Sequence, residues 1–284
     1  MCRLLGFISP TPTTAADLIG VDECRQWQSM GTVHDDGWGT AWIDTRAEAV
    51  ARFRTPTEGA DDPRLARALD AEAVDGRICH LRMATTGLGD LEENTHPFLA
   101  DGAAMAHNGS VHPIERLREF VSVAEIDEVG GTTDSAIIFA LVLRRLRQGE
   151  SLLNAVTGTV RMLRSDFDHP GINLLFLTLT EMIVVHATAG TQVPYLQGPL
   201  PPDHHDHYYR MSWRRFPDKA MIVSSSGLDH KGWNLIEQNT IMRLTVADGA
   251  ETIIRLQGGS VWSQAFWTVM VQLASVTRSK WVTG

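Results

Sequence analysis

The sequence is poor in cysteine and carries no recognisable export signal. Its 284 residues include only three cysteines, Cys2, Cys24 and Cys79, which form neither a disulfide framework nor the paired spacing of a zinc site. An odd number of cysteines without a signal peptide fits a reducing compartment, so we expect a cytoplasmic protein. We expect Cys79, in the apolar stretch RICHLRMA, to be an ordinary buried side chain.

Basic charge and long apolar runs are also scarce. The 34 acidic residues outnumber the 25 basic ones, and the net charge of −9 argues against a nucleic acid or a membrane as a partner. No run reaches the roughly 18 apolar residues of a membrane span. The nearest approach, residues 261–276, is interrupted by Ser263, Gln264 and Gln272, and we expect a packed terminal helix or a partner surface there.

The apolar patterns predict strands towards both ends of the chain and helices in the middle. The predicted strands are residues 2–9 (ended by Pro10 and Pro12), 36–44, 77–85, 103–111, 172–180, 181–188, 219–226 and 240–247. The predicted helices are residues 65–76 (closed by Gly76), 113–121 and 132–149. Two sheets with helices packed outside them accommodate this order, in one α+β domain.

Cys2 directly follows the initiator methionine. Methionine is normally removed when the next residue is small, which would leave Cys2 with both a thiol and a free α-amino group. The amine titrates at about 7.7–8.0 and the thiol at about 8.5, so the amine can act as the base for its own thiol. One residue would then supply both nucleophile and base for acyl transfer.

Acyl transfer also needs hydrogen-bond donors for the oxyanion, and AHNGSV (106–111) offers a pair. The side chain of Asn108 and the backbone N–H of Gly109 stand at a predicted strand end and suit an oxyanion hole. The alternative interpretation is a plain Asn-Gly hairpin turn, which this dipeptide often forms.

Two charged residues complete the set. Arg82 lies in the apolar stretch HLRMATT, where it either holds a substrate carboxylate through a two-pronged contact or pairs with a structural acid. Asp134 begins the predicted helix 132–149, where it either caps the helix or receives a substrate ammonium. A thiol, a cation and an anion together match an α-amino acid with an amide side chain, that is, a γ-glutamyl compound.

These residues stand in motifs that are similar to those of a known family. The motifs, in order, are MCRLLGF (1–7), HDDGWGTAW (34–42), HLRMATTG (80–87), NTHPF (94–98), AHNGSV (106–111) and TTDSA (132–136). The chain resembles the class II (N-terminal cysteine) glutamine amidotransferases of the short, free-standing kind. The resemblance implies the four-layer αββα Ntn-hydrolase fold, with two packed antiparallel sheets and helices outside.

The resemblance also assigns roles to residues. It implies that Cys2 is the nucleophile, that its amine is the base, and that Asn108 and Gly109 form the oxyanion hole. The implied substrate-binding residues are Arg82 for the α-carboxylate, Asp134 for the α-ammonium, and Thr85 and Thr86 at the pocket. The implied supporting residues are Gly37, Trp38, Asn94 and His96. The resemblance implies no cofactor and no metal.

The sequence departs from the synthase-linked members at two positions. Met83 and Thr86 stand where many of them carry Trp and His, and both positions contact or flank their glutamine pocket. Such differences resemble those of the family's free-standing γ-glutamyl hydrolases, including the one in ergothioneine biosynthesis. We expect residues 2–257 to form the amidotransferase domain and residues 258–284 to form a helical C-terminal tail. The histidine-rich DHHDHYY (203–209) is expected to be a solvated loop rather than a metal site.

The expected function is therefore cleavage of the γ-amide of glutamine or a γ-glutamyl conjugate through a thioester on Cys2, with release of glutamate. One alternative is a glutaminase subunit that delivers ammonia to a separate synthase. Another is a binding module that keeps the fold without turnover. The expected partners are a small-molecule substrate and, under the first alternative, the ammonia-accepting synthase.

Overall fold

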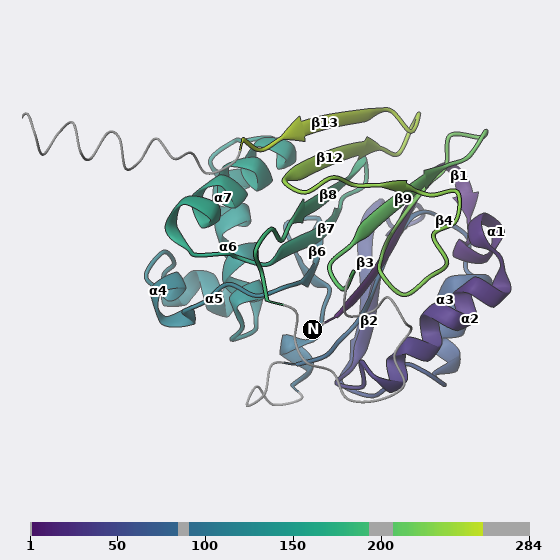
Figure 1. Ribbon diagram of the computed structural model, residues 1–284, viewed down its shortest axis with the longest axis horizontal. Helices are drawn as coiled ribbons and strands as arrows, with labels where there is room; N and C mark the ends of the chain where they lie inside the picture. The colour runs from purple at the N-terminus through teal and green to yellow at the C-terminus, as the bar shows by residue number, and fades with distance from the viewer. Residues whose placement is uncertain (1, 85–90, 193–206, 258–284) are drawn as a thin grey trace, which may run out of the picture.

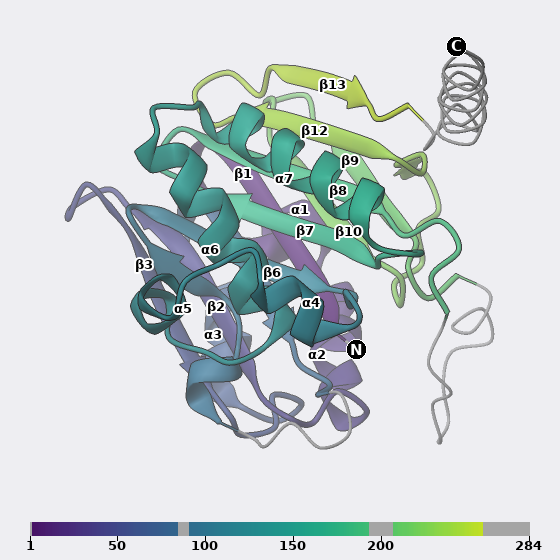
Figure 2. The ribbon, with the colours of Figure 1, turned by 90° about the vertical axis from the view of Figure 1, so that its left-hand side faces the viewer.

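Two antiparallel sheets lie face to face between two layers of helices (Figure 1). The computed structural model describes residues 2–84, 91–192 and 207–257. Helices cover the outer face of each sheet, and a view turned by 90° shows α6 and α7 in front of the second sheet (Figure 2). The predicted αββα architecture is confirmed.

The first sheet places the start of the chain at its centre. Within the described residues its strand order is β11-β9-β10-β1-β4-β2-β3. Strand β1 pairs with β10 through Leu5 and Ser224, and with β4 through Leu5 and Cys79. The first residues of β1 therefore lie between the end of β4 and the end of β10. The strands are β1 (Arg3–Thr13), β2 (Trp38–Asp44), β3 (Ala49–Thr55), β4 (Val74–Leu81), β9 (Met211–Arg215), β10 (Met221–Ser225) and β11 (Asn234–Leu235).

The second sheet packs its apolar face on the first. Its order is β13-β12-β8-β7-β6-β5 within the described residues. Leu4 and Ile78 from the first sheet meet Leu175 and Val184 from the second in one fully buried cluster, and removal of such side chains from water is the main driving force for sheet packing. The strands are β5 (Phe98–Ala100), β6 (Ala103–Asn108), β7 (Ile172–Leu177), β8 (Glu181–Ala187), β12 (Thr240–Thr245) and β13 (Glu251–Arg255).

The helices divide between the two outer faces. The outer face of the first sheet carries α1 (Ala15–Ile19), α2 (Val21–Ser29), η1 (Met30–Thr32) and α3 (Pro63–Asp70). The outer face of the second carries α4 (Ile114–Arg118), α5 (Val123–Val129), α6 (Asp134–Arg147) and α7 (Leu152–Asp166), and η2 is Glu92–Asn94. The predicted helix 132–149 is confirmed as α6, whose N-cap is Thr133.

Two predicted boundaries are wrong. Strand β1 does not end at Pro10 but continues to Thr13, and its pairing with β4 is interrupted between Ile8 and Thr13. The prolines therefore stand where the ladder needs no N–H donor. The predicted helix 65–76 ends at Asp70 as α3, and Gly76 belongs to β4. A Cβ atom on Gly76 would lie 3.0 Å from Ile43 Cδ1, so packing between strands explains this glycine.

Some predictions fall outside the described residues. These include the tail 258–284, the segment 203–206 of the histidine-rich loop, and the pocket residues Thr85 and Thr86. The domain boundary at 257 stays a prediction. None of the described helices has the length and apolarity needed to cross a bilayer.

Candidate active site

Cys2 stands at the start of β1 and is almost completely buried, with 7% of its surface exposed. Its backbone nitrogen donates to Oδ1 of Asn108 at 3.1 Å, and its Sγ lies 3.8 Å from the carbonyl oxygen of Met83. Cys2 is thereby joined to the end of β6 and to the segment that follows β4. Three motifs that are far apart in the sequence meet at this thiol.

Asn108 presents an unused donor beside Cys2. Its side chain is fully buried, and while Oδ1 accepts from Cys2, Nδ2 has no hydrogen-bond partner among the described residues. Leaving a buried amide donor unsatisfied costs about 1–3 kcal/mol, so such groups commonly mark functional positions. Asn108 therefore keeps one buried donor uncommitted beside Cys2.

Gly109 follows at a position that admits only glycine. A Cβ atom there would lie 2.0 Å from the carbonyl oxygen of Gly171, far inside contact distance. The close approach is fixed by Gly171, whose N–H donates to the carbonyl of Ser110 at 2.8 Å. Because the next strand begins only at Ile172, Asn108-Gly109 is not the two-residue turn of a hairpin.

Arg82 is 3% exposed and continues from β4 beside the HDDGWG segment. Its N–H donates to the carbonyl of Gly37 at 2.8 Å, and its Nη1 donates to the carbonyl of Asp36 at 3.0 Å. The carboxylate of Asp36 accepts from the N–H of Ala84 at 2.5 Å. Gly37 has φ +120°, and a Cβ there would lie 2.6 Å from the carbonyl of Thr55. The segment thus fixes the positions of both the backbone and the side chain of Arg82.

Asp134 is the first residue of α6, but the helix cap is Thr133, whose hydroxyl accepts from the N–H of Ala136 at 3.3 Å. The Asp134 carboxylate instead accepts from the N–H of Val111 at 2.8 Å and from the N–H of Ser135 at 2.9 Å. It is therefore tied to the loop that leaves the Asn108-Gly109 pair. The interpretation of Asp134 as the helix cap is therefore wrong, because the N-cap is Thr133.

His107 connects the Gly171 carbonyl to the start of α6 through its ring, a role that sequence reasoning missed. Its Nε2 lies 2.9 Å from the carbonyl oxygen of Gly171, and its Nδ1 lies 2.8 Å from the hydroxyl of Ser135. These distances fit the tautomer with the proton on Nε2. One ring therefore spans from the carbonyl that faces Gly109 to the N-terminus of α6. The feature of the sequence that could have indicated this role is the position of His107 directly before Asn108.

Two further histidines continue this network between the sheets. His80 Nε2 lies 3.2 Å from the carbonyl oxygen of His107 and 3.1 Å from Nδ1 of His96. Burial lowers the pKa of His80 to about 3 and the pKa of His96 well below its ordinary value. His80, His96 and His107 all act as buried hydrogen-bonding groups, and His80 and His96 are neutral at physiological pH.

The remaining supporting residues are also placed by the structure. Asn94 accepts from the N–H of Thr132 at 2.8 Å and donates to its hydroxyl at 3.2 Å, which orders the approach to α6. Trp38 is buried between the first sheet and its helices, where its Nε1 donates to Asp62 at 3.0 Å. Trp38 thus supports the strand that follows Gly37 from the outer side of the sheet.

The other two cysteines lie away from this cluster. Burial raises the pKa of Cys24 to about 12, and it also raises the pKa of Cys79, whose thiol lies 3.5 Å from the Thr40 hydroxyl. Both are protonated, inaccessible thiols, as predicted for Cys79. In the described part of the chain, no group of three or more potential ligands is placed to hold a metal ion.

Known proteins share both the sequence pattern and the fold. The family described as glutamine amidotransferases class-II matches residues 1–255. Glutamine–fructose-6-phosphate aminotransferase from Agrobacterium fabrum is 30% identical over 178 residues, which cover 60% of this chain and 28% of that protein. The enzyme of the same name from Mesorhizobium japonicum is 33% identical over 169 residues, 59% of this chain and 26% of that protein. The match spans little more than a quarter of these relatives.

Solved structures match over most of the chain. A glutamine aminotransferase class-II domain protein from Silicibacter pomeroyi superposes with a TM-score of 0.58 at 18% identity, over 90% of this chain and 100% of that one. Glutamine phosphoribosylpyrophosphate amidotransferase from B. subtilis gives a TM-score of 0.58 at 19% identity, over 89% of this chain and 49% of that one. At these identities the likeness concerns the fold.

Proposed function

The chain belongs to the class II glutamine amidotransferases, and on that premise we propose that it hydrolyses the γ-amide of glutamine or of a γ-glutamyl conjugate through a thioester on Cys2. The observation that carries the proposal is the side chain of Asn108. Its oxygen holds the Cys2 nitrogen, and its nitrogen is a buried donor without a partner among the described residues. A single amide thus serves both the base and the oxyanion.

The proposed reaction begins once Met1 has been removed. The α-amine of Cys2, oriented by Oδ1 of Asn108, takes the thiol proton, and Sγ forms a bond to the γ-carbonyl carbon. Nδ2 of Asn108 and the N–H of Gly109 stabilise the resulting oxyanion. The carbon–nitrogen bond then breaks, and the α-ammonium returns the proton to the departing amine.

Water completes the cycle. It attacks the thioester carbonyl while the α-amine accepts a proton, and glutamate leaves as the thiol is restored. The atoms balance as one amide and one water giving glutamate and one amine. The reaction needs no oxidant, reductant or cofactor from outside.

Recognition of the glutamyl half is proposed to rest on Arg82 and Asp134. Arg82 is next to Met83, whose carbonyl faces the thiol, and its planar guanidinium suits the α-carboxylate. Asp134 is joined to Val111, two residues beyond Gly109, and its carboxylate suits the α-ammonium. The pocket roles that the resemblance implies for Thr85 and Thr86 stay predictions, because both residues lie outside the described residues.

A second candidate function is delivery of the released ammonia to a synthase. The names of the curated relatives favour it, because they describe aminotransferases that act on glutamine and fructose 6-phosphate. In that case glutamine itself is the substrate, and the acceptor enzyme raises the rate of glutamate release. A binding module without turnover would release no glutamate under any condition.

The test is glutamate release by the purified full chain. We expect release from glutamine or a γ-glutamyl amide, and a loss of at least about a thousandfold in the Cys2→Ala variant, because the nucleophile is absent. The matched control is Cys24→Ala, which removes a buried thiol of α2 and leaves release in place. Persistent release by Cys2→Ala would refute the proposed nucleophile.

A further inference from the structure

The residue that follows the proposed nucleophile is a buried arginine. Arg3 is the first residue of β1 and is fully buried, although arginine side chains are almost never fully buried unless they are paired. Its Nη1 donates to the carbonyl of Cys2 at 3.0 Å, so the side chain turns back to the residue that precedes it. Because burial of a guanidinium is costly, this contact needs a physical explanation.

Two hydrogen bonds hold Cys2 at the two ends of its backbone. Its nitrogen donates to Oδ1 of Asn108 in the second sheet at 3.1 Å, and its carbonyl accepts from Arg3 in the first sheet. Regular pairing of β1 with β4 begins at Arg3, opposite Leu81. Since the nitrogen and the carbonyl of a residue fix the Cα between them, these two bonds also set the direction of the Cα–Cβ bond that carries Sγ.

The guanidinium of Arg3 is itself held by the ring of Tyr208. Its Cζ lies 4.3 Å from the ring centroid, within the roughly 6 Å at which a cation is attracted to an aromatic face. The hydroxyl of Ser226 donates to the Tyr208 carbonyl at 2.7 Å, and Nδ2 of Asn173 donates to the Tyr209 carbonyl at 2.9 Å. The ring is therefore fixed by residues of both sheets.

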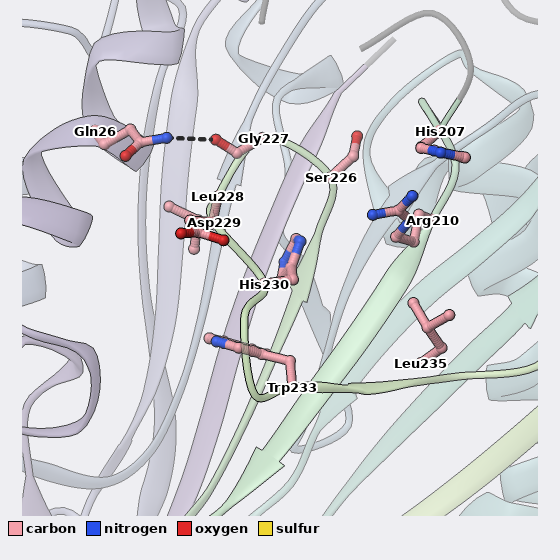
Figure 3. A pocket seen from close by; sticks show the side chains of 10 residues that line it. All are labelled: Gln26, His207, Arg210, Ser226, Gly227, Leu228, Asp229, His230, Trp233 and Leu235. Carbon is pink, nitrogen blue, oxygen red and sulfur yellow. Dashed lines mark hydrogen bonds between the residues drawn. The ribbon is translucent and has the colours of Figure 1, made fainter. Parts of the chain in front are cut away.

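The segment that follows β10 also packs against Arg3. A Cβ atom on Gly227 would lie 3.5 Å from Nε of Arg3, and Gly227 has φ +115°, a conformation that other residues rarely adopt. The Gly227 carbonyl accepts from Nε2 of Gln26 in α2 at 3.1 Å (Figure 3). Arg3 thus lies against backbone that a helix on the outer face of the first sheet keeps in place.

The same tyrosines reach the thiol by a second route. Met83 packs against the pair formed by Tyr208 and Tyr209, and its carbonyl oxygen lies 3.8 Å from Sγ of Cys2. The tyrosine pair therefore contacts both the side chain that holds the Cys2 carbonyl and the residue that faces the Cys2 sulfur. The surroundings of the thiol depend on Arg3 and on Met83 together.

We propose that Arg3 is a positioning residue for Cys2, which holds the Cys2 carbonyl so that the thiol stays aimed at the γ-carbonyl carbon of the substrate. Once Met1 is removed, Cys2 is the first residue of the chain, and chain ends are poorly ordered unless they are tied down. A charged donor makes a stronger hydrogen bond than a neutral one. This inference rests on the proposed hydrolysis at Cys2 and adds one residue to that same site.

The first experiment measures glutamate release by the full chain with Arg3→Met, which keeps much of the side-chain length and removes the donor. We expect kcat to fall by about tenfold to a hundredfold, because a misplacement of about 1 Å between reacting groups has effects of this size. KM should change by less than about twofold, since Arg82 and Asp134 stay in place. An unchanged kcat would overturn the inference.

The matched control is Arg77→Met. Arg77 is another buried arginine of the first sheet, in β4 opposite Phe7, and its guanidinium lies 5.4 Å from the ring centroid of Trp42. We expect urea unfolding to show that both variants change stability, whereas only Arg3→Met lowers kcat. Equal losses of kcat in the two variants would make Arg3 a structural residue and overturn the inference.

The second experiment compares Arg3→Lys with Arg3→Met. Lysine can still donate to the Cys2 carbonyl, but its ammonium is more strongly hydrated than a guanidinium and is costly to bury. We therefore expect the lysine variant to be the less stable of the two in urea and yet to have the higher kcat. A kcat that follows stability across the two variants would overturn the inference. Absence of glutamate release by the parent protein would instead refute the proposed function itself.

Discussion

The two sides of β1 differ in how their polar groups are held. Towards β4 and β6 the groups hold one another: Asn108 accepts from Cys2, and the Asp134 carboxylate accepts two backbone N–H groups. Towards β9 and β10, within the described residues, Nε2 of His230 is buried without a hydrogen bond and Arg210 has no ion-pair partner. One side is a closed hydrogen-bonded frame, and the other is open.

This difference teaches that the fold itself fixes the polar groups on the side of β1 that faces β4 and β6. A frame whose members fix one another keeps its geometry before any ligand arrives, so it suits a constant group such as the glutamyl moiety. The predictions below either separate the two sides or erase the distinction.

The largest effect is expected from Asn108→Asp. This change keeps an oxygen for the Cys2 N–H but replaces the unpartnered nitrogen, and loss of one oxyanion donor lowers kcat by about 10²–10³-fold. Because glutamine and γ-glutamyl conjugates form the same oxyanion, kcat should fall equally for glutamine and for a γ-glutamyl amide. Steady-state glutamate release measures it, and a loss confined to one substrate would contradict a shared site.

Gly109→Ala should damage the frame itself. Its Cβ would lie 2.0 Å from the Gly171 carbonyl, so backbone must shift, at a cost of about 3 kcal/mol of unfolding free energy. The control is Gly102→Ala, where φ is +73° but nothing lies within 4 Å, and we expect a loss of about 1 kcal/mol. Urea unfolding compares them. Equal losses would mean that the close approach to Gly171 is unimportant.

Arg82→Lys tests recognition on the closed side. An ammonium cannot reproduce a planar two-pronged contact, so the KM of every γ-glutamyl substrate should rise by about tenfold or more. An unchanged KM in Arg82→Lys would make Arg82 a structural residue.

The smallest effect is a pH dependence of stability. The pKa of His80 is about 3 in the folded protein, below its ordinary value of about 6.5. Between these two pH values the unfolded chain therefore binds more protons than the folded protein. Stability is therefore complete above about pH 6.5 and falls as pH drops, by roughly 1 kcal/mol per pH unit for this ring. Urea unfolding at pH 7 and pH 5 should show it. His80→Gln should flatten the slope, whereas the exposed His112→Gln should not.

The sequence allows the closed side to be predicted because its parts are local. Asn108 and Gly109 are adjacent, and Asp134 opens a helix whose apolar run and basic last turn are plain in the sequence. The strand before Arg82 is equally clear as an apolar run. Each motif carries its own local structure, so only their meeting at Cys2 had to be supplied by the family resemblance.

The open side could not be predicted from local patterns. Its members come from α2, from the segment before β9 and from the residues after β10, and they meet only because β10 pairs with β1 across more than two hundred residues. The hydrogen bonds of His107 are also set by packing of two sheets. The termination predicted at Pro10 failed for the same reason, since the ladder partner decides whether a proline is tolerated.

The most direct test of the account is the mass of the full chain before and after treatment with 6-diazo-5-oxonorleucine, a glutamine-like electrophile, with the adduct located by peptide mapping. The account predicts a chain that has lost Met1 and carries one adduct, on Cys2, whose formation glutamine slows. A chain that retains Met1, or an adduct found on Cys24 or Cys79 instead, would contradict it.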